Sequence, residues 1–435
     1  MNPLAEQLNA VLSSENNGAF SLLSEVGKAL FFPKGILTQS AEAKEKAYKI
    51  NATIGIAREK GDIMFLPSAM KGMDYPAEEI LSYASSFGIP ELRHIWRQAI
   101  LEKNPSLSGK SFSLPVVTCG ITHAISLFSE IWCNPGDTVI LPDMIWGNYN
   151  LIMNVRLGIG LRHYPTFNEK GGFHVEAFAR VMADEAEQKG KAIALLNFPQ
   201  NPTGYSLSRS EAFAIRDVLL DLAQKGKKVL AVLDDAYFGL FYEDETFKES
   251  LFALLADLHP NILAIKLDGA TKENFAWGLR IGFISYSTKI EKNAEAFYEA
   301  LERKTAGCIR GNISNASHAG QYIVLQSMKD PNYKKEHEEK RVILSRRANL
   351  VKEVLLDPKY GEAFIPYPFN SGYFMCVRLK DVDAEKLRVH LLKNYGVGLI
   401  ALGKTDIRIA FSCIEVEDIR PLFDILLQGV QDLKG

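Results

Sequence analysis

The middle of the chain alternates between short hydrophobic runs and longer amphipathic stretches. Runs with the length and β-branched character of buried strands cover residues 113–118, 137–141, 191–197, 228–234, 261–267 and 280–285. Helix-type periodicity covers residues 121–133 and 208–224. This alternation predicts an α/β fold, with a mostly parallel sheet covered by helices on both faces. In sheets of this kind, ligands bind beyond the carboxyl ends of the strands.

Both ends of the chain depart from this alternation. Residues 1–75 have mixed character and precede the regular pattern. The later pattern is first charged and helical and then strand-like, at residues 297–303, 333–356, 372–377 and 406–411. A chain of 435 residues is too long for a typical single core. We therefore predict a large domain over residues 76–308 and a smaller α/β domain built from residues 1–75 and 309–435.

Composition and charge argue against several kinds of partner. Hydrophobic residues make up 47% and charged residues 23%, as in ordinary globular proteins. A net charge of −2 gives no electrostatic reason to expect a nucleic acid or an anionic membrane as partner. The eight histidines form no cluster with metal-ligand spacing, so no metal site is expected.

The cysteines and the N-terminal residues favour a cytoplasmic protein. The five cysteines are scattered and odd in number, which favours buried free thiols in a reducing compartment over a disulfide framework. The first residues lack a basic region followed by an apolar core, so no signal peptide is predicted. No run approaches the roughly 18 apolar residues of a membrane span.

Lys272 stands between two predicted strands, and Arg280 follows eight positions later. A lysine held at the mouth of a sheet among small residues can lose its proton and attack a carbonyl as a free amine. The arginine stays charged at any working pH and suits a phosphate. A lysine for an aldehyde and an arginine for a phosphate together describe a site for pyridoxal 5′-phosphate. Considered alone, such a pair is more often part of a solvated turn. A cofactor site therefore requires suitable polar residues at the ends of the other predicted strands as well.

Polar residues also follow two earlier strands. The segment Asn-Phe-Pro-Gln-Asn-Pro-Thr-Gly bends the backbone after the first, either as a plain exit loop or to let Asn201 donate to the cofactor's phenolic oxygen. Asp234 ends the second, where a buried carboxylate needs a partner such as a protonated pyridine nitrogen. Asp235 is expected to cap the chain or face solvent instead. Tyr237 could share the phenolic oxygen with Asn201 or pack as a core tyrosine.

Two further strand exits add candidates. Residues 118–124 join a strand to a helix, where free N–H groups and the Thr122 hydroxyl can form a cradle for an anion. An ordinary N-cap explains Thr122 equally well. Trp146 lies in the loop beyond another strand, where it could stack on a pyridine ring or pack into the core.

In this order the segments resemble the class I/II aminotransferases, fold-type I enzymes that depend on pyridoxal 5′-phosphate, and most of all the aspartate/aromatic aminotransferase branch. The resemblance runs from about residue 50 to residue 408 and rests on Asn-Pro-Thr-Gly, Asp-x-Ala-Tyr, and a lysine followed by an arginine eight positions later. It implies a homodimer with active sites at the subunit interface. It also implies a covalent bond from Lys272 to the cofactor, with Asp234 on the pyridine nitrogen. The implied cofactor-binding residues are Tyr83 (acting on the partner's cofactor), Gly120, Ile121, Thr122, Trp146, Asn201, Asp234, Tyr237, Lys272 and Arg280.

The same resemblance implies a substrate site. Its implied residues are Ile54, Gly55, Asn201, Arg310 and Arg408. Arg408 matches the arginine that binds the substrate α-carboxylate as a bidentate pair. Arg310 matches one that crosses the dimer interface to a side-chain carboxylate, although members of this branch with that arginine also accept aromatic substrates, and a salt bridge would explain it nearly as well. Two positions depart from the family: Gly269 stands where a serine often binds the phosphate, and Phe275 where a smaller residue is usual.

The predicted activity is a two-step transfer of an amino group from an L-amino acid, acidic or aromatic by preference, to a 2-oxo acid. Lys272 is the expected general base, and Asp234 and Tyr237 are its catalytic companions. A carbon–sulfur or elimination lyase of the same fold would share every cofactor residue. A non-catalytic regulatory module that binds the cofactor or an effector normally carries a DNA-binding domain, and no basic helix-turn-helix pattern precedes the fold.

Overall fold

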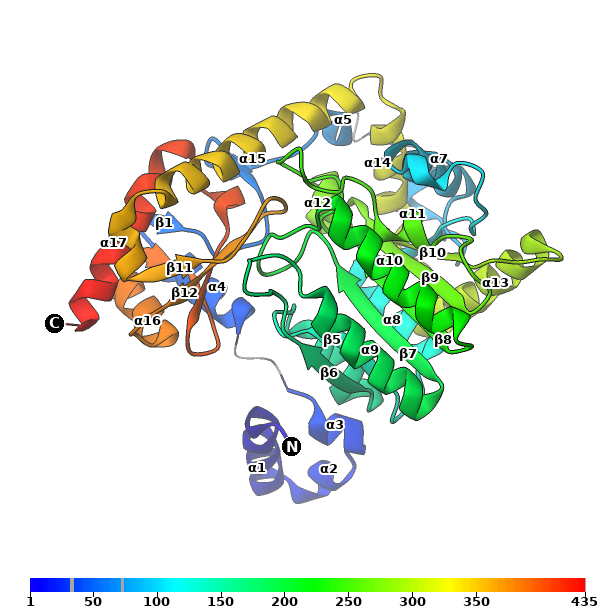
Figure 1. The fold of residues 1–435 in the computed structure, drawn as a ribbon, viewed down its shortest axis with the longest axis horizontal. Coiled ribbons are helices and arrows are strands. Elements are labelled where there is room, and N and C mark those ends of the chain that lie inside the picture. The colour runs from blue at the N-terminus through cyan, green and yellow to red at the C-terminus, as the bar shows by residue number, and fades with distance from the viewer. Residues whose placement is uncertain (32–34, 72–73, 435) are drawn as a thin grey trace.

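The central sheet of the computed structural model, which describes residues 1–31, 35–71 and 74–434, confirms the predicted α/β class (Figure 1). Across the described chain it has seven strands in the order β4-β10-β9-β8-β7-β5-β6. β10 pairs antiparallel with both neighbours, and the other pairings are parallel. The strands are β4 (Val116–Cys119), β5 (Thr138–Pro142), β6 (Gly160–Tyr164), β7 (Lys191–Asn197), β8 (Lys228–Asp234), β9 (Ile262–Gly269) and β10 (Ile281–Ser287).

The central strands are hydrophobic on both faces because helices cover both. Along β7, Ala192, Ala194 and Leu196 pack into one core cluster, and Ile193 and Leu195 pack into another. α9 (Val175–Lys189), α10 (Arg209–Gln224) and α11 (Leu251–Leu255) contact the first face. α8 (Gly120–Trp132) contacts the opposite face and packs against α13 (Ala294–Asn312).

The predicted strands and helices of the central region are all observed, but several observed elements, α9 among them, were not predicted. β7 and β8 have the predicted bounds, and α10 starts after Ser208, which forms a capping box with Glu211. The edge strand β6 was not predicted. Its sequence Gly-Leu-Arg-His-Tyr has no continuous hydrophobic run, because Arg162 and His163 interrupt it, as suits an edge that pairs on one side only.

A second core joins an early segment of the chain to its C-terminal third. Its four-stranded sheet has the order β11-β12-β15-β14, flanked by α16 (Ala384–Tyr395) and α17 (Val416–Lys434). The strands are β11 (Phe364–Pro366), β12 (Met375–Leu379), β14 (Ile400–Leu402) and β15 (Asp406–Ile409). The short strand β1 (Ile50–Asn51) pairs in parallel with β13 (Val397–Gly398), and Ile50 enters this core.

One long helix connects the two bodies. α15 (Tyr333–Leu355) contacts α14 (His318–Lys329) and α5 (Pro67–Met70) as well as α17, and its Ala348 and Val351 are buried in the C-terminal core (Figure 1). The preceding α14 places Val324 and Leu325 in the large core. We therefore propose that the change from the large to the small domain falls within α15, beyond the expected boundary at residue 309.

The N-terminal helices lie beside the two main bodies. α1 (Pro3–Glu15), α2 (Asn17–Ser21) and α3 (Glu25–Ala29) pack on one another at the bottom of Figure 1, and α4 (Ile36–Lys46) adjoins the C-terminal sheet. Other short elements include α5 (Pro67–Met70), α6 (Ala77–Leu81) and the hairpin of β2 (Arg58–Glu59) and β3 (Asp62–Ile63). Among the described helices, none has the length and apolar character needed to cross a membrane.

The two bodies are in close contact at Gly204. Its φ is +76°, and an added Cβ would lie 1.9 Å from the carbonyl oxygen of Phe374. Gly204→Ala is expected to combine left-handed strain of about 1–2 kcal/mol with overpacking of about 1–3 kcal/mol. The matched control is Gly226→Ala, where φ is +81° but no atom lies within 4 Å, so only the strain should remain. Urea unfolding of both variants tests this, and equal midpoints would contradict it.

Candidate active site

A cavity of about 300 Å³ opens at the carboxyl ends of the central strands. This is the position expected for a ligand site in a parallel sheet. Ten of the predicted site residues line it: Gly55, Ile121, Thr122, Trp146, Asn201, Asp234, Tyr237, Lys272, Arg280 and Arg408. The lining comes from both bodies, because Arg408 lies on β15 and most of the others follow strands of the large sheet.

Lys272 lies on the short helix α12 (Ala270–Glu273), directly after β9. Its Nζ lies 5.3 Å from the centre of the Tyr237 ring. Burial lowers the pKa of the Lys272 amine to about 8, Asp234 opposes this shift, and Arg280 adds to it. The Tyr373 hydroxyl donates a 2.8 Å hydrogen bond to the Lys272 carbonyl oxygen, which fixes this turn. A buried amine with a lowered pKa can act as a nucleophile or a base.

Asp234 ends β8 and is almost fully buried. Burial raises its pKa, while the hydroxyl of Tyr149 and the N–H of Ala236, which both donate to the carboxylate, oppose the rise. Tyr149 was not foreseen from the sequence. Its place three residues after Trp146 offered a weak helical-spacing signal, but its contact with Asp234 arises only when two strand ends meet.

Asn197 is a second residue that sequence reasoning passed over. It ends β7 beside Asp234, and its Nδ2 donates a 2.7 Å hydrogen bond to the Asp234 carbonyl oxygen. Its Oδ1 accepts a 2.9 Å hydrogen bond from the Asn201 backbone N–H. One amide side chain thereby fixes both polar strand exits relative to each other.

Asp235 lies on the other face of the sheet. It is 5% exposed and pairs with Lys266, which also lies 3.2 Å from Asp268, and it accepts a 2.6 Å hydrogen bond from the Ser250 hydroxyl. The expectation that Asp235 caps or faces solvent is therefore wrong. The large core buries it on the face away from the cavity, and Lys266 supplies the charge that a buried carboxylate requires.

Close backbone packing shapes the Arg280 end of the cavity. An added Cβ at Gly120 would lie 2.8 Å from Arg280 Nη2, so this guanidinium and the start of α8 are in direct contact. At Gly269 an added Cβ would lie 2.7 Å from the Ile281 carbonyl oxygen, which leaves no room for the serine usual in the family. Thr271 lines the cavity, and its buried hydroxyl has no partner among the described residues.

Phe275, the other departure from the family, packs away from the cavity. Its side chain is 4% exposed and lies in an apolar cluster with Tyr237, Tyr373 and Phe374. It does not appear in the cavity lining, and its ring contacts Trp277 and His337. The larger residue therefore fills the core and does not line the cavity.

Arg408 lines the cavity from the C-terminal body, on the side away from the large sheet. It is 2% exposed, and burial lowers the pKa of its guanidinium. Nη2 donates to the Thr53 carbonyl oxygen at 2.9 Å, and Nη1 to Asn201 Oδ1 at 3.3 Å. Its Nε has no partner among the described residues, so the guanidinium retains a donor for an anion.

Four predicted residues lie outside the cavity lining of the single chain: Gly120 adjoins Arg280, and the other three are exposed. Tyr83 is 92% exposed, and Arg310 is exposed near the end of α13, where it donates a 3.4 Å hydrogen bond to Ser314. Ile54 is 39% exposed, and only its neighbour Gly55 lines the cavity.

The lining fits pyridoxal 5′-phosphate. A buried carboxylate, a low-pKa amine and an arginine beside a helix start supply one partner each for a ring nitrogen, an aldehyde and a phosphate. The unpartnered Thr271 hydroxyl and Arg408 Nε leave polar groups free for bound molecules.

The family model for class I and II aminotransferases matches residues 57–426. A probable N-acetyl-LL-diaminopimelate aminotransferase of Bacillus subtilis is 25% identical over 80% of each chain, and an aspartate aminotransferase of Sulfurisphaera tokodaii is 25% identical over 81% of this chain and 82% of its own. Among solved structures, an aminotransferase from Anaerococcus prevotii aligns with a TM-score of 0.82 and 25% identity, over 94% of this chain and 98% of its own. A kynurenine aminotransferase of Pyrococcus horikoshii has a TM-score of 0.78 at 19% identity, over 96% and 99%, and shows the shared fold.

In the cofactor-free protein, the Lys272 amine is expected to become reactive near pH 8, because burial lowers its pKa to about that value. Reductive methylation with labelled formaldehyde, followed by NMR against pH, measures this titration. Asp234→Asn should move the midpoint lower, because the Asp234 charge favours the ammonium form. A midpoint near that of exposed lysine side chains would contradict the prediction.

Proposed function

The chain belongs to the class I and II aminotransferases, which depend on pyridoxal 5′-phosphate, and we propose that it moves an amino group from an acidic or aromatic L-amino acid to a 2-oxo acid. One observation carries the proposal: Lys272, Asp234, Arg280 and Arg408 line a single cavity. The names of relatives support the substrate range, since they include aspartate and aspartate/prephenate aminotransferases.

We assign the cofactor contacts to residues of this lining. Lys272 holds the cofactor covalently, Asp234 pairs with the ring nitrogen, and Trp146 packs on the ring. Asn201 and Tyr237 contact the phenolic oxygen. The phosphate is held by Arg280, Gly120, Ile121 and Thr122, and by the Thr271 hydroxyl in place of the family serine.

The protein residues divide the work of the reaction. When bound, the cofactor supplies an electron sink for the bond that breaks at the substrate Cα. Arg408 binds and orients the substrate α-carboxylate. Lys272 removes the proton from Cα and returns it on the cofactor side. The Asp234 carboxylate holds the proton on the ring nitrogen, and Tyr149 keeps that carboxylate in place.

Exposed Tyr83 and Arg310 fit a homodimer in which each subunit completes the other's site. We propose that Tyr83 reaches the phosphate bound by the partner and that Arg310 reaches the side chain of the substrate there. Both side chains extend from the surface of the single chain, as this arrangement requires.

A panel of L-amino acids, added to the holoenzyme without an acceptor, tests the function. Aspartate, glutamate and the aromatic amino acids are expected to convert the cofactor to pyridoxamine 5′-phosphate. The loss of visible absorption measures this conversion. Lys272→Ala should slow the conversion by at least about 10²–10⁴-fold, the contribution of a positioned base. The exposed lysine variant Lys228→Ala is the control and should retain the wild-type rate.

Two results of this panel would contradict the proposal. Release of ammonia without pyridoxamine 5′-phosphate would indicate a lyase, and the absence of any spectral change would indicate a non-catalytic module.

Arg310→Ala should weaken turnover of aspartate and glutamate more than that of aromatic amino acids, and an equal loss for both would remove Arg310 from the substrate site.

Asp234→Asn and Asp235→Asn form a matched pair, because the two carboxylates are neighbours on opposite faces of the sheet. Asp234→Asn is expected to lower kcat about 10²-fold or more while thermal stability changes little, because it removes the charge opposite the ring nitrogen. Asp235→Asn should lower Tm, because it removes one partner of buried Lys266. The loss of stability should stay below the ~3–5 kcal/mol of a fully unpaired buried charge, because Asp268 remains as a partner. Steady-state kinetics and thermal unfolding of both variants test this, and the opposite assignment of effects would contradict it.

A further inference from the structure

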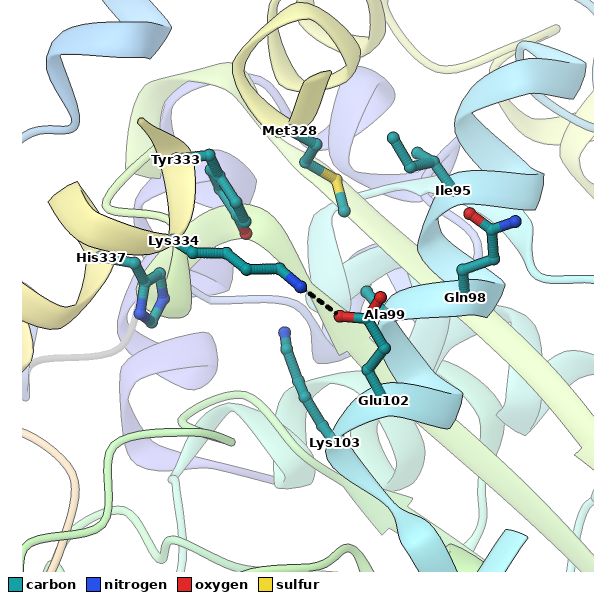
Figure 2. A pocket seen from close by; sticks show the side chains of 9 residues that line it. All are labelled: Ile95, Gln98, Ala99, Glu102, Lys103, Met328, Tyr333, Lys334 and His337. Carbon is teal, nitrogen blue, oxygen red and sulfur yellow. Dashed lines mark hydrogen bonds and ion pairs between the residues drawn. The ribbon is translucent and has the colours of Figure 1, made fainter. Parts of the chain in front are cut away.

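A second cavity lies apart from the candidate active site, between α7 (Pro90–Lys103), the end of α14 and the start of α15 (Figure 2). Its volume is about 470 Å³, within the range of about 300–1,000 Å³ typical of small-molecule sites. Among the described residues, its lining shares none with the candidate active site.

Two lysine side chains enter this cavity from different helices. Lys103 Nζ, from α7, lies 2.7 Å from Glu273, and Lys334 Nζ, from α15, lies 2.8 Å from Glu102. Both side chains point into the same space in Figure 2. An ammonium group carries three N–H donors, so each lysine can bind another acceptor while keeping its carboxylate.

The two ion pairs differ in how readily they can rearrange. The side chains of Lys334 and Glu102 are 80% and 60% exposed, so their pair contributes little and can reorganise around a ligand. The side chain of Glu273 is only 6% exposed, which keeps Lys103 in place. Glu273 lies outside the cavity lining, so the lining itself presents two ammonium groups and the Glu102 carboxylate. Such a lining offers a partner for each charge of a ligand that carries one charge of each sign.

The rest of the cavity lining is mainly apolar. Ile95, Ala99 and Met328 contribute to it, together with the ring of Tyr333 (Figure 2). Met328 is flexible and polarisable and can adapt to different side chains. His337 adds a polar group without charge, because burial lowers its pKa and its Nε2 has no partner among the described residues.

We propose that this cavity binds a zwitterionic α-amino acid with an apolar or aromatic side chain. The carboxylate of the ligand lies between Lys103 and Lys334, and its ammonium group contacts Glu102. The side chain lies against Ile95 and Met328. The assignment rests on the cavity's own charges and walls and does not depend on the activity proposed above.

The site also contacts the helix that carries Lys272. Lys103 holds Glu273, the residue that follows Lys272 in α12. The His337 ring lies 6.0 Å from that of Phe275, two residues further on. A ligand that binds the Lys103 ammonium group therefore contacts the partner of Glu273, the residue next to Lys272.

Equilibrium dialysis of the holoenzyme with α-methyl-L-phenylalanine tests the proposal. This probe keeps both charges and an aromatic side chain, but its Cα bears no proton, so transamination cannot consume it. The visible spectrum of the cofactor reports occupancy of the active site separately. We expect two bound molecules per chain in the wild type and one in Ala99→Trp, which fills the second cavity. Ala99→Ser, the matched control, should still bind two.

The proposal would be overturned if the wild type bound no more probe than the active-site occupancy that the spectrum reports. It would also be overturned if Ala99→Trp bound as many molecules per chain as the wild type. Lys334→Met provides a variant that leaves the core intact and should weaken second-site binding about tenfold. Phenethylamine and 3-phenylpropionate each lack one of the two charges and should compete about tenfold more weakly at the second site. Equal competition by either would overturn the assignment of a zwitterion. A missing spectral change would count against the proposed activity and leave the dialysis result interpretable.

Discussion

Burial drives Lys272 and Asp234 towards their uncharged forms inside one cavity. The rest of the site depends on this desolvation of two ionisable groups. The pKa of the lysine falls to about 8, and the pKa of the aspartate rises. A buried carboxylate is stable as an anion only when donors and a cation surround it. Tyr149 and the backbone of Ala236 supply donors, and a protonated ring nitrogen would supply the cation. The same desolvation that makes the lysine a free amine thus makes a cationic heterocycle the fitting partner of the acid.

The two-residue period of a strand decides which acid can serve this purpose. Along β8, Val229, Ala231 and Leu233 pack into the core on one face, whereas Val232 packs into the core beneath the cavity. Asp234 continues the second set, and Asp235 the first. Lys266 lies on the same face as Asp235, because β9 alternates in the same way. Register and pleat therefore separate two adjacent carboxylates into a site residue and a core ion pair.

The sequence predicted those features that depend on local pattern, and it failed where contacts form between distant segments. β7 and β8 were predicted to the residue because buried strands are hydrophobic throughout and end in polar residues. The lining was largely predicted because the carboxyl ends of parallel strands meet at one edge. Tyr149 and Asn197 could not be recognised, because their partners lie 85 and 37 residues away and only the strand order brings them together. The roles of Tyr83 and Arg310 depend on a second subunit and stay predictions.

The Arg280 end of the cavity shows how missing side chains can make a binding surface. An added Cβ at Gly282 would lie 2.6 Å from the backbone of Gly120, and one at Gly269 would lie 2.9 Å from Gly282. These three glycines let β9, β10 and the start of α8 approach so closely that no side chain fits between them. A serine at position 269 would force these strands apart, so this position cannot offer the hydroxyl that often binds the phosphate elsewhere in the family. Thr271 lies two residues further along, in the turn that carries Lys272. It lines the same cavity, and its buried hydroxyl has no partner among the described residues. The close packing at Gly269 thus excludes a hydroxyl from that position, while Thr271 places one in the cavity-lining turn that follows.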